Sequence, residues 1–171
     1  MRKPKNKYFF IEHMNVLGKE EGGEHYIFRE GTWEPDTGCC IMDRLMGYDP
    51  FEPEDSPYRT GSLSVMDEIV EINEKEARRV MADQTVEMLL HMWPQKFAEK
   101  KKVWDENPGW PAKLVHVSFT LYGEKFDILP EDIGLTHDCW DQGFMETVQS
   151  DMRRDLENYG AENVFCGGFI D

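Results

Sequence analysis

LVHVSFTLYGEKFDIL, residues 114–129, is the stretch that decides the fold. Apolar and polar residues alternate through its first half, which is typical of a β-strand with one buried face. The inward-facing residues are expected to be Val115, Val117, Phe119 and Leu121. Gly123-Glu124 suits a two-residue type II′ turn, and Phe126 and Ile128 continue the pattern beyond it. The stretch therefore predicts an antiparallel β-hairpin.

A helix is predicted downstream of this hairpin, because apolar residues recur there every four positions. These residues are Trp140, Phe144, Val148, Met152 and Leu156. Gly160 is expected just beyond the end of the helix in the left-handed conformation. The segment NVF before Cys166 is interpreted as a last short strand. We expect the apolar face of the helix to pack on the inward face of the hairpin.

A second helix is predicted upstream of the hairpin. Asn73 and Glu76 have the spacing of a capping box, in which each side chain bonds the other residue's backbone N–H. Pro94 is expected to kink or end this helix, with a second helical piece from about Gln95. The alternating segment MDEIVEI, residues 66–72, predicts a strand just before the helix.

The N-terminus predicts another hairpin. Residues 8–11 and 25–30 are rich in β-forming side chains, and GKEEGG, residues 18–23, is interpreted as the turn between them. Strands and helices come in blocks, which favours an α+β fold: a mostly antiparallel sheet built from hairpins, with two or three helices packed on one face. We expect a single domain over residues 1–171, with an irregular acidic and proline-rich excursion at about 31–61.

Composition and charge limit the classes of partner. The chain has 171 residues, 40% of them apolar, and a formal charge of −15 from 34 acidic and 19 basic side chains. This composition is that of a folded protein with an acidic surface, which repels nucleic acid and anionic lipid and attracts basic proteins. No window approaches the roughly 18 apolar residues of a membrane span. With four cysteines and no signal-peptide pattern, we expect a soluble cytoplasmic protein that binds neither nucleic acid directly nor membrane.

Catalytic motifs are not found in the sequence. There is no Cys-x-x-Cys pair, no HExxH and no Gly-x-Ser-x-Gly. We therefore expect no metal, no cofactor and no catalytic residue. The alternative is a small metal-dependent or cysteine-based enzyme that uses His137, Cys139 and Cys166, because imidazole and thiolate are ligands that zinc prefers. The sequence favours a protein that is not an enzyme.

Acidic residues are concentrated in two regions. Residues 43–76 hold ten acids against three bases, and residues 124–162 hold eleven against three. In the first region, YDPFEPEDSPY, residues 48–58, contains three prolines and is expected to be an extended surface segment. In the second, carboxylates are expected on the exposed face of the last helix. The predicted partner-binding residues are Tyr48, Asp49, Phe51, Glu52, Glu54, Asp55, Tyr58, Asp141, Asp151 and Asp155.

These residues suggest an interaction protein that binds a basic partner. Carboxylates spaced three or four residues apart on a helix lie roughly 5–6 Å from each other and could imitate the phosphates of DNA or RNA. The partner would then be a basic nucleic-acid-binding enzyme that this protein inhibits. The rings of Tyr48, Phe51 and Tyr58 would provide apolar anchors beside the charge. The competing interpretation is that the charge only keeps the protein in solution.

Overall fold

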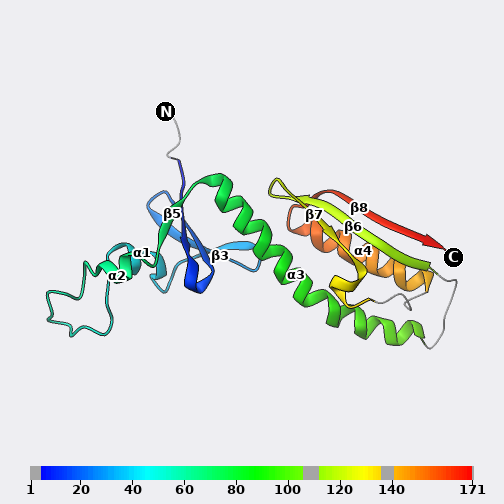
Figure 1. Cartoon of the computed structure of the whole chain (residues 1–171), viewed down its shortest axis with the longest axis horizontal. Helices are drawn as coiled ribbons and strands as arrows, with labels where there is room; N and C mark the ends of the chain where they lie inside the picture. Colours follow the sequence, from blue (N-terminus) through cyan, green and yellow to red (C-terminus); the bar gives the residue numbers. More distant parts are fainter. Residues whose placement is uncertain (1–4, 106–111, 136–140, 171) are drawn as a thin grey trace. The chain divides into compact units, whose positions relative to one another are not determined.

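The computed structural model describes residues 5–105, 112–135 and 141–170. The chain divides into two compact units, an N-terminal unit of Met1–Met81 and a C-terminal unit of Ala82–Asp171. Both units combine antiparallel strands with helices (Figure 1), so the predicted α+β class is confirmed. That the chain forms a single domain stays a prediction.

The N-terminal unit is built on a five-stranded antiparallel sheet with the order β4-β3-β2-β1-β5. Its strands are β1 (Lys7–Ile11), β2 (Val16–Glu21), β3 (Glu24–Arg29), β4 (Thr32–Pro35) and β5 (Val70–Ile72). The first four strands follow one another as a meander, and β5 returns from much later in the chain to pair with β1. Only the end of the predicted strand at 66–72 is therefore in the sheet.

The predicted N-terminal hairpin is wrong in its pairing. Residues 8–11 pair with β2, which sequence reasoning had assigned to the turn, and β2 then pairs with β3. The tight turn is Gly22-Gly23 alone, with φ of 60° and 83°. Such positive φ angles belong to the two-residue turns that best join twisted strands. Lys19 fits within β2 because its charged end lies over the rings of Tyr26 and Trp33.

One face of this sheet carries the core of the N-terminal unit, made of Phe9, Ile11, Ile27, Ile41 and Ile69. Ile41 belongs to the helix α1 (Cys40–Leu45), whose first turn is held by Asp36: its two carboxylate oxygens accept hydrogen bonds from the backbone N–H groups of Cys40 and Ile41, at 3.0 and 2.8 Å. Gly18 lies directly beneath α1, since a Cβ there would come within 2.3 Å of Ile41 Cδ1. A larger residue at position 18 would therefore force the buried Ile41 side chain to move.

The excursion expected at 31–61 contains regular structure. It includes β4 and α1, and its longest irregular segment is residues 46–62, which lead to the short helix α2 (Leu63–Met66). This remaining irregular segment is the most acidic and most proline-rich part of the excursion.

The long helix α3 (Glu74–Asp105) begins at the predicted capping box. The Glu76 N–H donates to Asn73 Oδ1 at 2.8 Å, and the Asn73 N–H donates to Glu76 Oε2 at 3.1 Å. Of the two effects predicted for Pro94, an end of the helix is wrong, because α3 runs through this residue, while a kink stays a prediction. A proline inside a helix costs about 3 kcal/mol. Trp93 and Phe97 on either side of it are both fully buried, which stabilises the helix enough to offset that cost.

The C-terminal unit is built on a three-stranded antiparallel sheet with the order β7-β6-β8. Its strands are β6 (Ala112–Leu121), β7 (Glu124–Ile128) and β8 (Glu162–Ile170). The predicted hairpin is β6–β7, but its turn is Tyr122-Gly123, one residue earlier than expected, with φ of 51° and 84°. The predicted short last strand is the nine-residue β8, which makes β6 the central strand.

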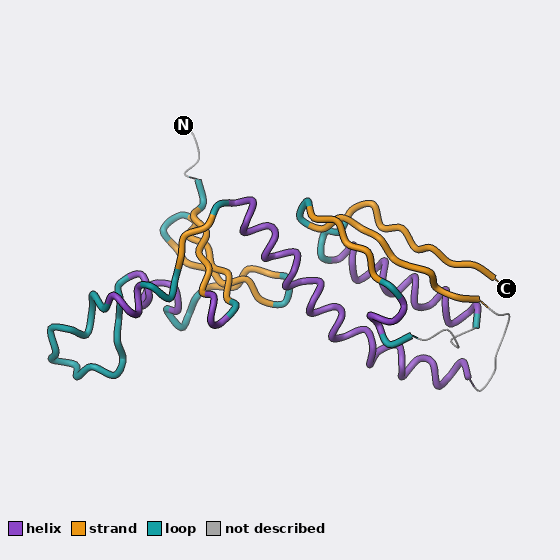
Figure 2. Tube along the Cα trace, in the orientation of Figure 1, coloured by secondary structure: helices purple, strands orange, loops and turns teal. Residues whose placement is uncertain are grey.

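The helix α4 (Gln142–Asn158) and the later part of α3 pack on one face of this sheet (Figure 2). The core joins Val117, Phe119 and Leu121 of β6 with Phe144, Val148, Met152 and Leu156 of α4, as predicted, and adds Leu89, Trp93 and Phe97 of α3. Val115 is 41% exposed, because a bulge between Leu114 and His116 turns Leu114 inward in its place. Gly160 has the expected left-handed conformation, and Trp140 lies outside the described residues.

Candidate interaction site

Residues 46–62, here called the acidic loop, form a closed loop. Its base is fastened by backbone hydrogen bonds from Gly61 N–H to Met46 O (2.8 Å) and from Ser62 N–H to Gly47 O (3.0 Å). A Cβ at Gly47 would come within 2.6 Å of Ser62 N, and Gly47 has a φ of 64°. Only glycine fits this position, so the two ends of the loop are brought together by the backbone itself.

The acidic loop folds as consecutive turns, and the predicted extended course is wrong. Backbone N–H groups donate three residues back, from Glu52 to Asp49 O (3.3 Å) and from Arg59 to Ser56 O (3.3 Å). Pro50 and Pro57 each occupy the second position of one of these turns, where the fixed φ of proline is favoured. The prolines therefore favour turns. The sequence argument, which only excluded helix and sheet, did not distinguish turns from an extended segment.

Arg59 holds the two sides of the acidic loop together. Its guanidinium lies 5.0 Å from the centre of the Tyr48 ring, and its Nε donates to the Tyr48 hydroxyl oxygen at 3.2 Å. Its Nη1 donates to the carbonyl oxygen of Glu52 at 3.2 Å. The hydrogen bond to Tyr48 raises the pKa of Arg59. Tyr48 is thus a half-buried part of the loop's own structure and not the exposed anchor that was predicted.

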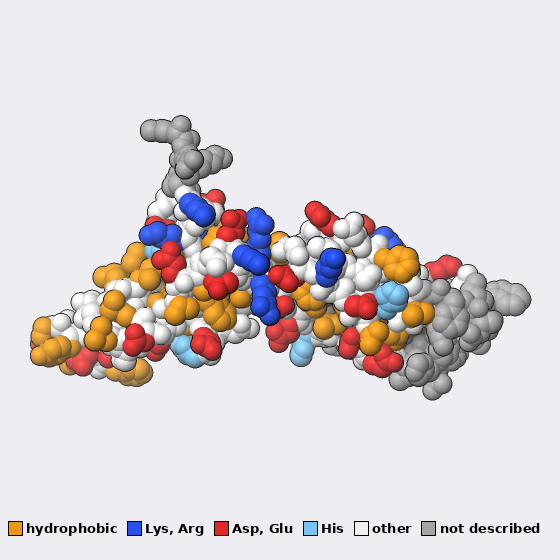
Figure 3. Space-filling view, turned by 45° about the horizontal axis from the view of Figure 1, so that its top comes forward, with side chains coloured by type: hydrophobic (Ala, Val, Ile, Leu, Met, Phe, Trp, Pro, Cys, Tyr) orange, Lys and Arg blue, Asp and Glu red, His pale blue; other side chains and the backbone are white. Residues whose placement is uncertain are grey.

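Phe51 and Tyr58, the other two predicted anchors, project into solvent and are 96% and 74% exposed. Further exposed apolar side chains are Met46 at the start of the acidic loop, Met42 of α1, and Leu63 and Met66 of α2. In Figure 3, apolar side chains gather over this end of the N-terminal unit, with carboxylates among them. Exposed apolar side chains gathered in one region are typical of interaction sites.

The four predicted carboxylates of the acidic loop accompany these rings. Glu54 and Asp55 are exposed, while Asp49 and Glu52 are half-buried. Asp49 Oδ1 accepts from the Phe51 N–H at 3.0 Å, and Glu52 Oε2 accepts from the Ser56 hydroxyl at 2.9 Å. The structure therefore brings the acids and Phe51 together in one ordered loop.

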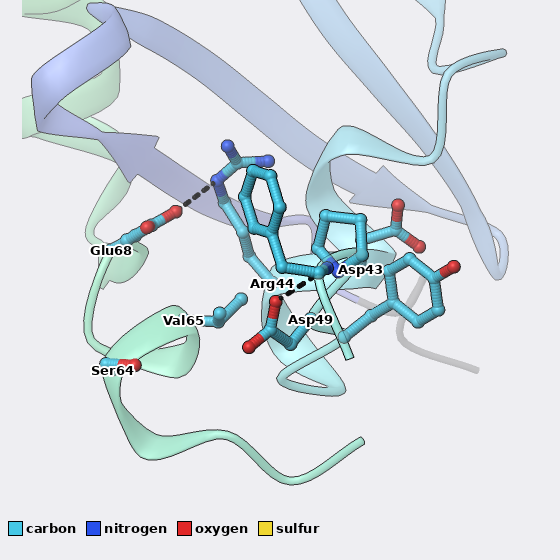
Figure 4. Close-up of a pocket in the computed structure, with 9 residues that line it drawn as sticks. Asp43, Arg44, Asp49, Ser64, Val65 and Glu68 are labelled. Carbon is cyan, nitrogen blue, oxygen red and sulfur yellow. Dashed lines mark hydrogen bonds and ion pairs between the residues drawn. The ribbon is translucent and has the colours of Figure 1, made fainter. Parts of the chain in front are cut away.

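A cavity of about 440 Å³ lies between the acidic loop and the two short helices (Figure 4). Arg44 of α1 reaches across to Glu68, and its Nε is 3.1 Å from Glu68 Oε2. The cavity is lined by Asp43, Arg44, Tyr48, Asp49, Pro50, Phe51, Ser64, Val65 and Glu68. Sequence reasoning identified Tyr48, Asp49 and Phe51 but missed the residues from α1 and from 64–68, which lie apart in the sequence.

Among the carboxylates expected on the exposed face of α4, Glu146 and Glu157 are exposed, whereas the three predicted to bind a partner, Asp141, Asp151 and Asp155, are not. Asp141 is 7% exposed and caps the helix, because its Oδ1 accepts from the Phe144 N–H at 2.9 Å. Asp155 is half-buried and accepts hydrogen bonds from Trp93 Nε1 (2.9 Å) and Lys96 Nζ (3.0 Å). These two residues serve the fold of the C-terminal unit.

Asp151 is the most deeply buried of these three carboxylates, at 5% exposure. It is hydrogen-bonded to Lys100 and pairs with Lys96 at 3.8 Å and with Arg154 at 3.0 Å. Burial alone would raise the pKa of its carboxyl group, but Lys100 and Lys96 outweigh this effect and the pKa is lowered. The prediction that Asp151 and Asp155 are exposed is wrong, because the buried face of α4 also includes the side that meets α3.

The alternative metal or thiol site was predicted at His137, Cys139 and Cys166, and the structure describes only Cys166. His137 and Cys139 lie outside the described residues. Cys166 is half-buried in β8, and burial raises the pKa of its thiol while Arg153 opposes the shift. Burial likewise raises the pKa of Cys40. Within residues 5–105, 112–135 and 141–170 there is no group of three His, Cys, Asp or Glu side chains arranged to hold a metal ion.

Comparison with known proteins gives no match to any protein family, curated protein or solved structure. Of the helices in the described part of the chain, none has the length and apolar character that crossing a membrane requires.

Proposed function

We propose that this chain is an interaction protein that binds a basic protein partner through the acidic loop and the adjoining helices α1 and α2. The observation that carries the proposal is Phe51, which is 96% exposed on a loop that is otherwise tied down by its own hydrogen bonds. Covering an exposed ring beside carboxylates removes apolar area from water, so it stabilises a complex with a partner. The cytoplasm remains the proposed location.

The order of the acidic loop supports binding over solubility as its role. Solvating charges do not need a fixed backbone, whereas the loop has a glycine-dependent base and the Arg59–Tyr48 contact. Fixing a loop before binding lowers the entropy cost of association. Met42, Leu63 and Met66 add exposed apolar area next to the loop, and solubility gives no reason for such area.

The partner is proposed to be basic because the acidic loop has more carboxylates than it can neutralise. Its only cation, Arg59, is bound to Tyr48 and Glu52, whereas Glu54 and Asp55 are exposed. Inhibition of a nucleic-acid-binding enzyme remains one form of this proposal. The carboxylates that would imitate phosphates in that case are those of the acidic loop, since Asp141 and Asp151 of α4 are buried.

Site-specific photo-crosslinking tests this proposal. A photoreactive phenylalanine analogue replaces Phe51 in one sample and Val103, an exposed residue of α3, in the control. Both proteins are irradiated in lysate of the cells that make the protein, at low and moderate salt. We expect one basic protein to be captured from position 51 and not from position 103. Equal capture from both positions, or none from position 51, would contradict the proposal.

A further inference from the structure

The cavity beside the acidic loop is lined by one cationic side chain, Arg44, which is held by contacts inside the protein. Arg44 Nη1 donates to the carbonyl oxygen of Cys40 at 3.1 Å, and Nη2 lies 3.1 Å from Met14 Sδ. Its Nε lies 3.1 Å from Glu68 Oε2, an ion pair without hydrogen-bond geometry. The charge of Arg44 is therefore balanced by Glu68, and the other two carboxylates of the cavity lining, Asp43 and Asp49, leave the cavity with an excess of negative charge.

The carboxylates of the cavity keep free capacity to accept hydrogen bonds. Asp49 uses Oδ1 for the Phe51 N–H, and Glu68 uses one oxygen, Oε2, for its contacts with Arg44 and, at 3.9 Å, with His13 Nε2. In the part of the chain that the structure describes, no hydrogen bond reaches the carboxylate of Asp43 or the second oxygen of Asp49. A carboxylate can accept about four hydrogen bonds. The cavity thus presents acceptors and an excess of negative charge, which match a cationic donor.

The other walls of the cavity are apolar, and they decide which cation fits. Pro50 and Phe51 line it from the acidic loop and Val65 lines it from the helix α2. A planar guanidinium can lie against an aromatic ring while its N–H groups reach carboxylates at its edge, whereas an ammonium is compact and strongly hydrated. The volume of about 440 Å³ is within the range of pockets that hold small ligands.

We propose that this cavity binds an arginine side chain of the partner, with Asp43, Asp49 and Glu68 accepting from the guanidinium and Phe51 covering its plane. The inference rests on the proposed function and specifies the chemistry of the partner: a protein that presents an exposed arginine. Phe51 then has two roles, as one wall of the cavity and as exposed apolar surface around it.

The test uses the full-length chain labelled with nitrogen-15 and a defined probe, Nα-acetyl-arginine amide, followed by NMR titration. The same titration with the citrulline analogue removes the charge and keeps the shape, and the lysine analogue keeps the charge and removes the plane. We expect saturable shifts of the amide signals of residues 43–51 and 64–68 with arginine, and much weaker binding of the other two probes.

Matched variants locate the site. Asp49→Asn keeps an oxygen for the Phe51 N–H but removes the charge, and it should weaken arginine binding by about two- to fivefold, the range for a partly exposed ion pair. Glu54→Gln removes a charge from the same loop outside the cavity, and it should leave the affinity for the arginine probe unchanged. Equal binding of citrulline or lysine, or an Asp49→Asn variant that binds arginine normally, would overturn the inference.

Failure of the inference is distinguishable from failure of the proposed function. If a partner captured through position 51 binds Asp49→Asn as tightly as the original protein and is not displaced by the arginine probe, the proposed function stands and the arginine pocket is wrong. If the probe binds in the cavity but no partner is captured through position 51, the pocket stands and the proposed function is wrong.

Discussion

Replacement of Asp151 by asparagine should destabilise the C-terminal unit, although asparagine has nearly the same shape. Asp151 is 5% exposed and faces Lys96, Lys100 and Arg154, whose side chains are 25%, 38% and 59% exposed. Breaking a fully buried ion pair costs about 3–5 kcal/mol, and an exposed one about 0–1 kcal/mol. With a buried carboxylate and partly hydrated cations, we expect a loss of about 2 kcal/mol.

Thermal unfolding followed by circular dichroism measures this loss. For a chain of this length, about 2 kcal/mol corresponds to a fall in Tm of about 4–8 °C. Glu157→Gln is the control, because Glu157 is exposed on the same helix and the substitution removes the same charge. A Tm for Asp151→Asn equal to that of the control would refute the assignment of Asp151 to a buried ion-pair cluster.

The same contribution should depend on pH. The pKa of Asp151 is lower in the folded protein than in the unfolded chain, where a free Asp has a pKa of about 4. Its stabilisation is therefore present above about pH 4 and is lost as the pH falls through the lower, folded-state pKa. The difference in Tm between the original protein and Asp151→Asn should shrink over this acidic range and stay constant near neutral pH.

Two further substitutions test the fold around the site and the core. Gly47→Ala places a Cβ within 2.6 Å of Ser62 N at a φ of 64°, so it should destabilise the acidic loop by about 1–3 kcal/mol. The loss should appear as faster hydrogen exchange of the Gly61 and Ser62 amides. Unchanged exchange would contradict the glycine-dependent base of the loop. Phe144→Ala should lower the free energy of unfolding by about 3–5 kcal/mol in urea, and an unchanged transition midpoint would show that the buried face of α4 is assigned wrongly.

Elements with a complete local signal were predictable from the sequence. The alternation of residues 114–129 gave the β6–β7 hairpin, and the four-residue period of Phe144, Val148, Met152 and Leu156 gave the buried face of α4. The capping box at Asn73 located the start of α3. In each case neighbours in the sequence determine the geometry, so no knowledge of distant contacts is needed.

Features that depend on distant contacts were not predictable in this way. The bulge that turns Val115 outward comes from the pairing of β6 with β8, and the continuation of α3 through Pro94 comes from burial of the side chains around it. The sequence does contain one signal for the contact between α3 and α4. Lys96 and Lys100 are four residues apart on one helix, and Asp151 and Asp155 are four residues apart on the other. Such matched pairs indicate two helices facing each other through their charges.

The candidate site was predictable in part. Exposure of Phe51 and Tyr58 follows from the proline-rich context, which keeps them out of helices and sheets. The inward turn of Tyr48 follows from Arg59, eleven residues away, and from a loop closure that only the position of Gly47 hints at. The cavity joins three segments of the chain, and its lining therefore required the folded structure.

The affinity of the captured partner at two salt concentrations tests the central claim most directly. Measured at about 0.05 M and about 0.5 M salt, binding to the original protein should weaken steeply as salt rises, because exposed charges are screened. Phe51→Ala should weaken binding at least about tenfold at both concentrations with an unchanged salt slope, since a buried ring acts through apolar area. Glu54→Gln with Asp55→Asn should flatten the slope. Affinity that is equal at both concentrations and indifferent to both sets of substitutions would contradict the claim that the acidic loop is a binding surface.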